Sequence, residues 1–171
     1  GLTFESAYGM LCMKLAFAFQ DYQFLLDDAA ISDDDKGMFK RILGRTASMD
    51  ETKSCFLLLT RMLEIHFKKS AVVILDEYDV PIAKASSNGY YSQMLDVMRA
   101  MMSTTLKDNI SLDFAVVTGC LKIAKESIFT GTNNFVSDTI LSPRLSESFG
   151  FTQTDVDQIL KDAGLESQSA E

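Results

Sequence analysis

Two short apolar runs with a helix-patterned segment between them constrain the fold more than any other feature of this sequence. Residues 71–75 read AVVIL and residues 112–117 read LDFAVV. Short runs rich in β-branched residues predict strands, and we expect the first to be buried on both faces. Residues 89–108 repeat apolar side chains at helical spacing. A strand, a helix and a second strand in this order predict parallel strands with a right-handed crossover, and therefore an α/β fold.

Helices are predicted on both sides of this unit. Residues 6–27, 31–43 and 48–70 each carry apolar side chains three and four positions apart, as helices do. The first segment is apolar nearly all round, which is typical of a helix buried between layers. Residues 151–164 predict a final helix, and residues 136–141 a short strand.

The length of 171 residues and the hydrophobic content of 47% fit one globular domain. We predict this domain over residues 1–165, with a helical region at 1–69 and a strand-bearing region at 70–165. The tail, residues 166–171, predicts disorder. Because the first residue is Gly and not Met, we expect the chain to begin inside a longer protein or after a cleaved tag.

Charge and hydropathy exclude several classes of function. The net charge is -8, and no more than two Lys or Arg residues are adjacent, which disfavours direct binding of nucleic acid. No apolar run reaches the ~18 residues that span a bilayer, and the start of the chain lacks the pattern of a signal peptide. We therefore expect a cytoplasmic protein without a membrane segment.

The cysteines and the single histidine offer little for catalysis. Cys12, Cys55 and Cys120 are odd in number, far apart and set among apolar residues, so they predict reduced core thiols. His66 stands alone, which argues against zinc sites built on histidine and against Ser-His-Asp chemistry. We interpret His66 as structural because no neighbour in sequence would orient it. The methionines of residues 94–102 predict core packing, with a pliable binding groove as the alternative.

An acid pair follows the first predicted strand without a gap. Asp76 and Glu77 occupy the carboxyl end of that strand, and Thr118 the end of the next. Functional groups gather at such ends in a parallel sheet, so we expect all three residues to meet at one edge. An apolar strand closing on Asp-Glu is the Walker B pattern of P-loop NTPases, in which Asp holds Mg²⁺ and Glu positions water. The alternative is a strand that leaves the core and meets a charged turn.

Three segments, in this order and spacing, carry a resemblance to a known family. VVILDEYDVPI, FAVVTGCLKIAKESIFTGTNNF and LSESFGFTQTDV, all within residues 70–160, resemble the predicted AAA-ATPase-like family of bacterial proteins. Members often carry a nuclease-like domain of the PD-(D/E)XK type after the ATPase region. The resemblance implies a partial P-loop NTPase-like three-layer fold with a short parallel sheet and many covering helices. It also implies ATP and Mg²⁺ as ligands of the full-length protein.

The resemblance assigns roles to single residues. It implies that Asp76 is the Mg²⁺-site acid and Glu77 the catalytic acid. Thr118 falls at the sensor position, where a polar side chain can detect the γ-phosphate or the attacking water. Lys122 falls where the family more often shows Arg, and it keeps the positive charge without bidentate geometry.

Other residues complete the family's patterns without an evident chemical role. Tyr78, Asp79 and Pro81 complete the DEYDxP signature, and we interpret Asp79 as a structural cap or loop anchor. Asn133 and Asn134 match the family's pair of asparagines.

The phosphate-binding loop GxxxxGK[ST] is missing from the sequence. The nearest string, GMFKRILGRT, spaces Gly37 and Gly44 too widely and lacks the Lys. The simplest account is an internal fragment that starts after the loop, and the other is a degenerate ATPase. We thus expect part of an ATPase that hydrolyses Mg-ATP only as the full-length protein, or alternatively a non-hydrolytic interaction module. The chain alone should bind Mg-ATP weakly, because its acids repel a triphosphate.

Overall fold

The computed structural model describes most of the chain, namely residues 2–120, 136–139, 142–145 and 150–165. Contacts divide the chain into two compact units, residues 1–132 and 133–171, and each is described by itself. Predictions that concern Lys122, Asn133, Asn134 and residues 166–171 fall outside the described residues.

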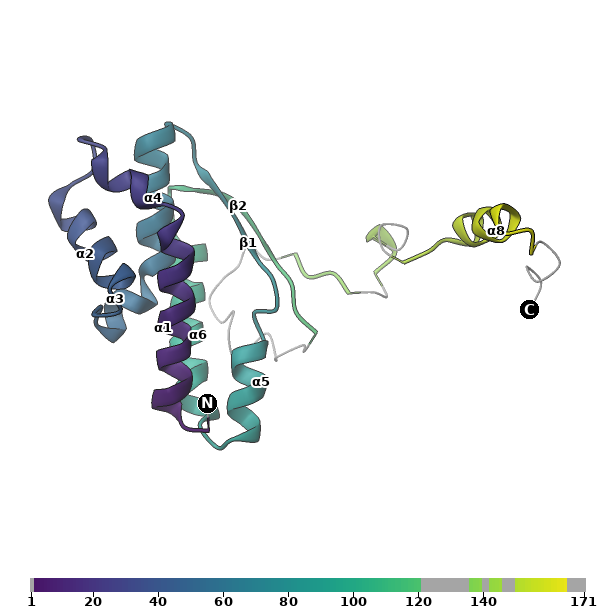
Figure 1. The fold of residues 1–171 in the computed structure, drawn as a ribbon, viewed down its shortest axis with the longest axis horizontal. Coiled ribbons are helices and arrows are strands. Elements are labelled where there is room, and N and C mark those ends of the chain that lie inside the picture. The colour runs from purple at the N-terminus through teal and green to yellow at the C-terminus, as the bar shows by residue number, and fades with distance from the viewer. Residues whose placement is uncertain (1, 121–135, 140–141, 146–149, 166–171) are drawn as a thin grey trace. The chain divides into compact units, whose positions relative to one another are not determined.

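A parallel pair of strands forms the sheet of the first unit (Figure 1). Strand β1 spans Ala71–Leu75 and strand β2 spans Leu112–Val117, with Val72 opposite Phe114 and Leu75 opposite Val117. The predicted strand-helix-strand unit is confirmed, and with it the assignment to the α/β class.

Helix α6, Tyr91–Leu106, connects the strands and presents a methionine-rich face to the core. Its buried residues are Met94, Leu95, Val97, Met98, Met101, Met102 and Thr105. The prediction that these methionines pack in the core is confirmed. Helix α4, Cys55–Phe67, lies beside β1, and α6 lies beside β2 (Figure 1).

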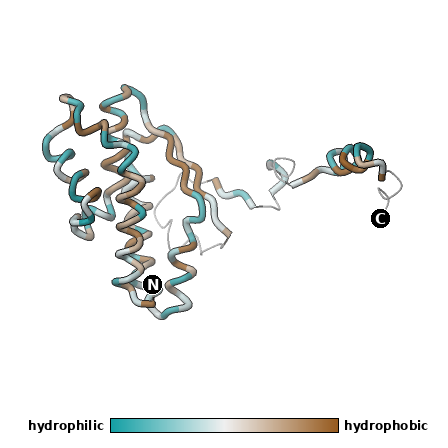
Figure 2. Tube along the Cα trace, in the orientation of Figure 1, coloured by the Kyte–Doolittle hydropathy of each residue, from teal (hydrophilic) through white to brown (hydrophobic). Residues whose placement is uncertain are grey.

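The opposite face of the sheet is exposed, and we call it the open sheet face. It consists of Val72, Ile74, Phe114 and Val116, which are 46%, 73%, 54% and 44% exposed. Both strands are strongly apolar in Figure 2. The prediction that residues 71–75 are buried on both faces is therefore wrong. Within the described residues, helices cover one face, and burial alternates along β1.

The first predicted helix is two elements. Helix α1 spans Phe4–Gln20, capped by the Thr3 hydroxyl, and a 3-10 helix, η1, spans Gln23–Asp27. The turn between them places Leu25 in the core, where it is fully buried. Packing of that side chain overrides the helical periodicity, which runs on through the break.

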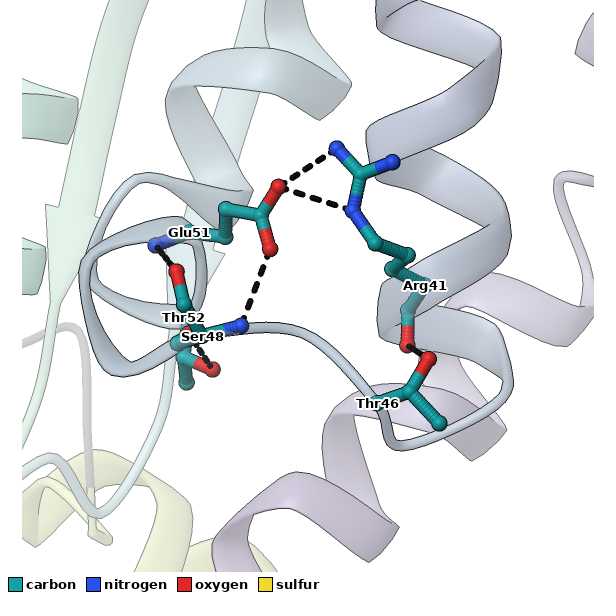
Figure 3. A network of polar contacts seen from close by, with 5 residues as sticks. All are labelled: Arg41, Thr46, Ser48, Glu51 and Thr52. Atoms are coloured by element: carbon teal, nitrogen blue, oxygen red, sulfur yellow. Dashed lines mark hydrogen bonds and ion pairs between the residues drawn. The ribbon is translucent and has the colours of Figure 1, made fainter.

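The third predicted helix is also divided. Helix α3 spans Met49–Lys53 and ends at Ser54, after which α4 begins. Figure 3 shows why α3 starts where it does: the Ser48 hydroxyl accepts the amide of Glu51, whose carboxylate accepts the Ser48 amide at 2.9 Å. The other oxygen of Glu51 accepts two hydrogen bonds from Arg41 on α2. This network joins the end of α2 to the start of α3.

Helix α2, Asp33–Leu43, is confirmed as predicted, with Ser32 as its N-cap. Its Phe39 packs on Phe19 of α1, with 4.8 Å between ring centroids, and both side chains are fully buried. This pair lies in the hydrophobic core, which continues through α4 and α6.

Helix α5, Val80–Ser87, was not predicted from the sequence. Asp79 occupies its N-cap position, and Pro81 lies in its first turn. Proline is favoured there because the first amides of a helix have no partner within it. Tyr78 and Asp79 separate this helix from the acid pair.

The second unit contains η2, Pro143–Leu145, and helix α8, Gln153–Asp162. The predicted final helix is confirmed, and Thr152 and Asp155 cap each other's amides at its start. Residues 136–139 form no strand, and residues 140–141 of that prediction lie outside the described residues.

No helix in the described ranges is long and apolar enough to cross a membrane.

The three cysteines differ in burial. Cys55 is buried, and burial raises the pKa of its thiol to about 12, but Cys12 is partly exposed and Cys120 is exposed. The prediction of core thiols is therefore correct for Cys55 and wrong for Cys120.

Candidate functional site at the ends of the parallel strands

The carboxyl ends of β1 and β2 bring Asp76 and Thr118 together, as expected from the sequence. The Thr118 hydroxyl donates a hydrogen bond to Oδ1 of Asp76. The same oxygen accepts the backbone amide of Glu77 at 2.9 Å. All three residues are exposed to solvent. The predicted convergence at one edge of the sheet is present, while the roles assigned to these residues stay predictions.

Backbone hydrogen bonds continue the strand pairing past its end. The Thr118 amide donates to the Leu75 carbonyl at 2.9 Å, and the Thr118 carbonyl accepts the Tyr78 amide at 3.2 Å. Thr118 is therefore held by its backbone on both sides. The backbone from which its hydroxyl extends is therefore fixed relative to the residues that follow β1.

Glu77 has an unusual backbone conformation. Its φ angle is +53°, in the left-handed region that non-glycine residues seldom adopt. Such angles cluster at sites where function constrains the backbone. Among the described residues, no Lys or Arg forms an ion pair with the exposed Glu77 carboxylate. The side chain is thus not held in a structural salt bridge within that part of the chain.

Tyr78 and Asp79 pack against the backbone of Gly119. Asp79 is 3% exposed, and its burial sets it apart from Asp76. A methyl group built on Gly119 would lie 2.5 Å from Oδ1 of Asp79 and 2.7 Å from Cε1 of Tyr78. Burial and the neighbouring Asp79 raise the pKa of the Tyr78 hydroxyl. The close approach explains why the residue after Thr118 carries no side chain.

Replacing Gly119 by Ala is expected to destabilise the fold by about 1 to 3 kcal/mol, the usual range for overpacking, because the buried Asp79 cannot move aside freely. Denaturant unfolding measures the change. Gly9→Ala is the matched control, since a methyl group there meets nothing within 4 Å, and alanine in an exposed helix should stabilise by about 1 kcal/mol. Equal effects of both substitutions would contradict the predicted packing at Gly119.

His66 lies before β1, whereas the acid pair follows it. Its Nδ1 is 2.8 Å from Oδ2 of Asp28, and its ring packs against Phe24 and Phe67. The amide of Ala30 and the His66 ring hold the pKa of Asp28 below its usual range. Sequence reasoning missed this partner because it lies 38 positions away. The arrangement agrees with a structural histidine.

The acid pair fits a magnesium site of the kind that needs few protein ligands. No group of three or more His, Cys, Asp or Glu side chains within the described residues is placed to hold a metal ion. Mg²⁺ bound to nucleotides uses phosphates, water and one or two carboxylates, and therefore needs no protein cage. Asp76 presents an exposed carboxylate of this type. Lys122, the other predicted ligand-binding residue, lies outside the described residues.

Comparison with known proteins identifies a family and a curated relative. A family model described as "Predicted AAA-ATPase" matches residues 13–129. A curated protein of Azotobacter chroococcum mcd 1, described as "Uncharacterized protein in vnfD 5'region", is 30% identical over 121 residues. The matched part is 70% of this chain and 23% of the relative, so the chain spans about a quarter of that protein. No solved structure matches the chain.

Proposed function

Because this chain belongs to the predicted AAA-ATPase family, we propose that it supplies the Walker B acids of a P-loop NTPase that hydrolyses Mg-ATP. One observation carries the proposal. The Asp76 carboxylate is held at the carboxyl end of β1 by the Thr118 hydroxyl, with the carboxylate of Glu77 beside it in sequence and exposed. Parallel sheets bind their ligands at this position.

Asp76 is the residue that would hold Mg²⁺. When bound with ATP, the ion neutralises charge that develops on the phosphate oxygens. Asp76 contributes one negative charge at a defined place and needs no second protein acid, in keeping with the few protein ligands that Mg²⁺ requires.

Glu77 would act on the attacking water. Its carboxylate orients the water and accepts its proton as the oxygen bonds to phosphorus. An exposed carboxylate without an ion-pair partner among the described residues is available for this role. The Glu77 residue has a left-handed backbone, and its amide donates to Oδ1 of Asp76.

The phosphate cradle is proposed to come from another part of the full-length protein. The chain has no GxxxxGK[ST] motif, and its relative is about four times longer than the matched region. The remaining length also has room for an effector such as the nuclease-like domain that the family resemblance implies. In this proposal, a covering layer over the open sheet face completes the three-layer fold.

A non-hydrolytic interaction module is the second candidate. The open sheet face favours it, because four aligned and exposed apolar side chains are a surface suited to protein contact. In that case the acids keep only their structural contacts. The two candidates differ in whether ATP turnover depends on Asp76 and Glu77.

Asp76→Asn in the full-length protein tests the proposal. The substitution removes the charge and preserves the shape, so the Mg²⁺ concentration for half-maximal ATP turnover should rise about tenfold or more, the scale of one lost charged contact. A magnesium titration of ATPase activity measures this shift. Asp113→Asn, an exposed aspartate on β2, is the control and should leave the titration unchanged. A full-length protein without ATP turnover would favour the interaction module, and equal titrations for both variants would remove Asp76 from the magnesium site.

A further inference from the structure

Thr118 makes its hydrogen bond to a protein acid and not toward solvent. A threonine hydroxyl has one hydrogen to donate, and in this structure it goes to Oδ1 of Asp76. Only lone pairs of the Thr118 oxygen remain for other contacts. A phosphate oxygen also needs a donor, so Thr118 cannot serve it while the bond to Asp76 is intact.

Oδ1 of Asp76 has two donors that come from different strands. One is the Thr118 hydroxyl after β2, and the other is the Glu77 amide after β1. Hydrogen bonds to a charged carboxylate are stronger than those between neutral groups. No described residue places a hydrogen-bond donor on Oδ2 of Asp76. One oxygen of the Asp76 carboxylate is therefore hydrogen-bonded twice, and the other accepts no hydrogen bond from a described residue.

The backbone that carries each donor is held in place. Backbone bonds to Leu75 and from Tyr78 fix Thr118, and Gly119 packs closely on the residues after the acid pair. The Glu77 amide reaches Asp76 from a left-handed backbone. An exposed carboxylate would otherwise exchange between rotamers, and two fixed donors on one oxygen oppose that exchange.

We propose that Thr118 is a positioning residue for Asp76: its hydroxyl at the end of β2 holds the Asp76 side chain in one rotamer and so fixes where the carboxylate faces the ligand. A role of this orientation in magnesium binding rests on the proposed function, but the orientation of Asp76 by Thr118 does not depend on it. Any displacement of the end of β2 would release Asp76. Through Thr118, the position of the end of β2 thus determines the orientation of Asp76, the proposed magnesium ligand that follows β1.

The test is the rotamer distribution of Asp76 in this chain, without nucleotide. Three-bond NMR couplings from the backbone nitrogen and carbonyl carbon to Cγ of Asp76 report it directly. Wild type and Thr118→Ser, which keeps the hydroxyl, should show a single rotamer. Thr118→Val, which keeps the shape and removes the hydroxyl, should lose the single-rotamer couplings. Thr46→Val, at an exposed threonine on another loop, is the control and should match wild type.

The outcomes separate positioning from the ATPase proposal. Unchanged couplings in Thr118→Val, or averaged couplings in Thr118→Ser, would overturn the positioning role. In the full-length protein, Thr118→Val should lower Mg-ATP turnover about tenfold, with rescue by Thr118→Ser. Averaged couplings in Thr118→Val, together with turnover that does not depend on Asp76, would keep the positioning role and reject the proposed function.

Discussion

Glu77→Gln in the full-length protein is expected to lower ATP turnover by about 10²-fold or more while ATP binding is retained. Glutamine preserves the size of the side chain and its hydrogen bonds to water, but it cannot accept the proton. General-base catalysis contributes about 10² to 10⁴ in rate, and this contribution is what the substitution removes. Steady-state phosphate release and a fluorescent-nucleotide titration measure the two quantities separately.

Glu5→Gln is the matched control for this experiment. Glu5 is exposed in the first turn of α1, and the same change of charge there should leave turnover unchanged. Equal turnover in Glu77→Gln and wild type would assign Glu77 to structure. A loss of ATP binding in Glu77→Gln would instead mean that Glu77 acts on the ground state and not on the chemical step.

Phe39→Ala should have the largest effect on stability of any single substitution considered for this chain. Phe39 is fully buried and packs on Phe19, so truncation leaves a cavity between α1 and α2. Losses of this kind cost about 3 to 5 kcal/mol, a large part of the 5 to 15 kcal/mol typical of a domain. Urea unfolding followed by circular dichroism gives the change in the free energy of unfolding.

Phe17→Ala provides the comparison for the core substitution. Phe17 lies on the same helix as Phe19 but is 61% exposed, so its removal should change stability by no more than about 0.5 kcal/mol. A similar loss in both variants would mean that Phe17 is covered in solution. A small loss in Phe39→Ala would mean that the packing between α1 and α2 is loose.

The strand pair and its polar ends could be predicted from the sequence because they depend on local signals. Short β-branched runs define β1 and β2, and parallel pairing then requires their carboxyl ends to meet. That geometry alone places Asp76 near Thr118. The family resemblance was consistent with the same residues, and the match over residues 13–129 confirms the family.

The features that were missed depend on contacts between distant residues or on backbone conformation. The break after α1 arises from burial of Leu25, and the partner of His66 comes from another helix. Asp79 and Pro81 are residues typical of a helix start and could have indicated helix α5, but they were interpreted only as part of the family signature. The left-handed backbone of Glu77 has no signal in sequence, since glutamate has no preference for it.

The open sheet face also determines how the isolated chain behaves in solution. In the described part of the chain the sheet has only two strands, so unpaired backbone groups border the apolar surface of Val72, Ile74, Phe114 and Val116. Such borders are templates for intermolecular strand pairing and aggregation. The net charge of -8 opposes this, because molecules of like charge repel one another. Salt screens that repulsion, so the colloidal stability of the isolated chain decreases as ionic strength rises.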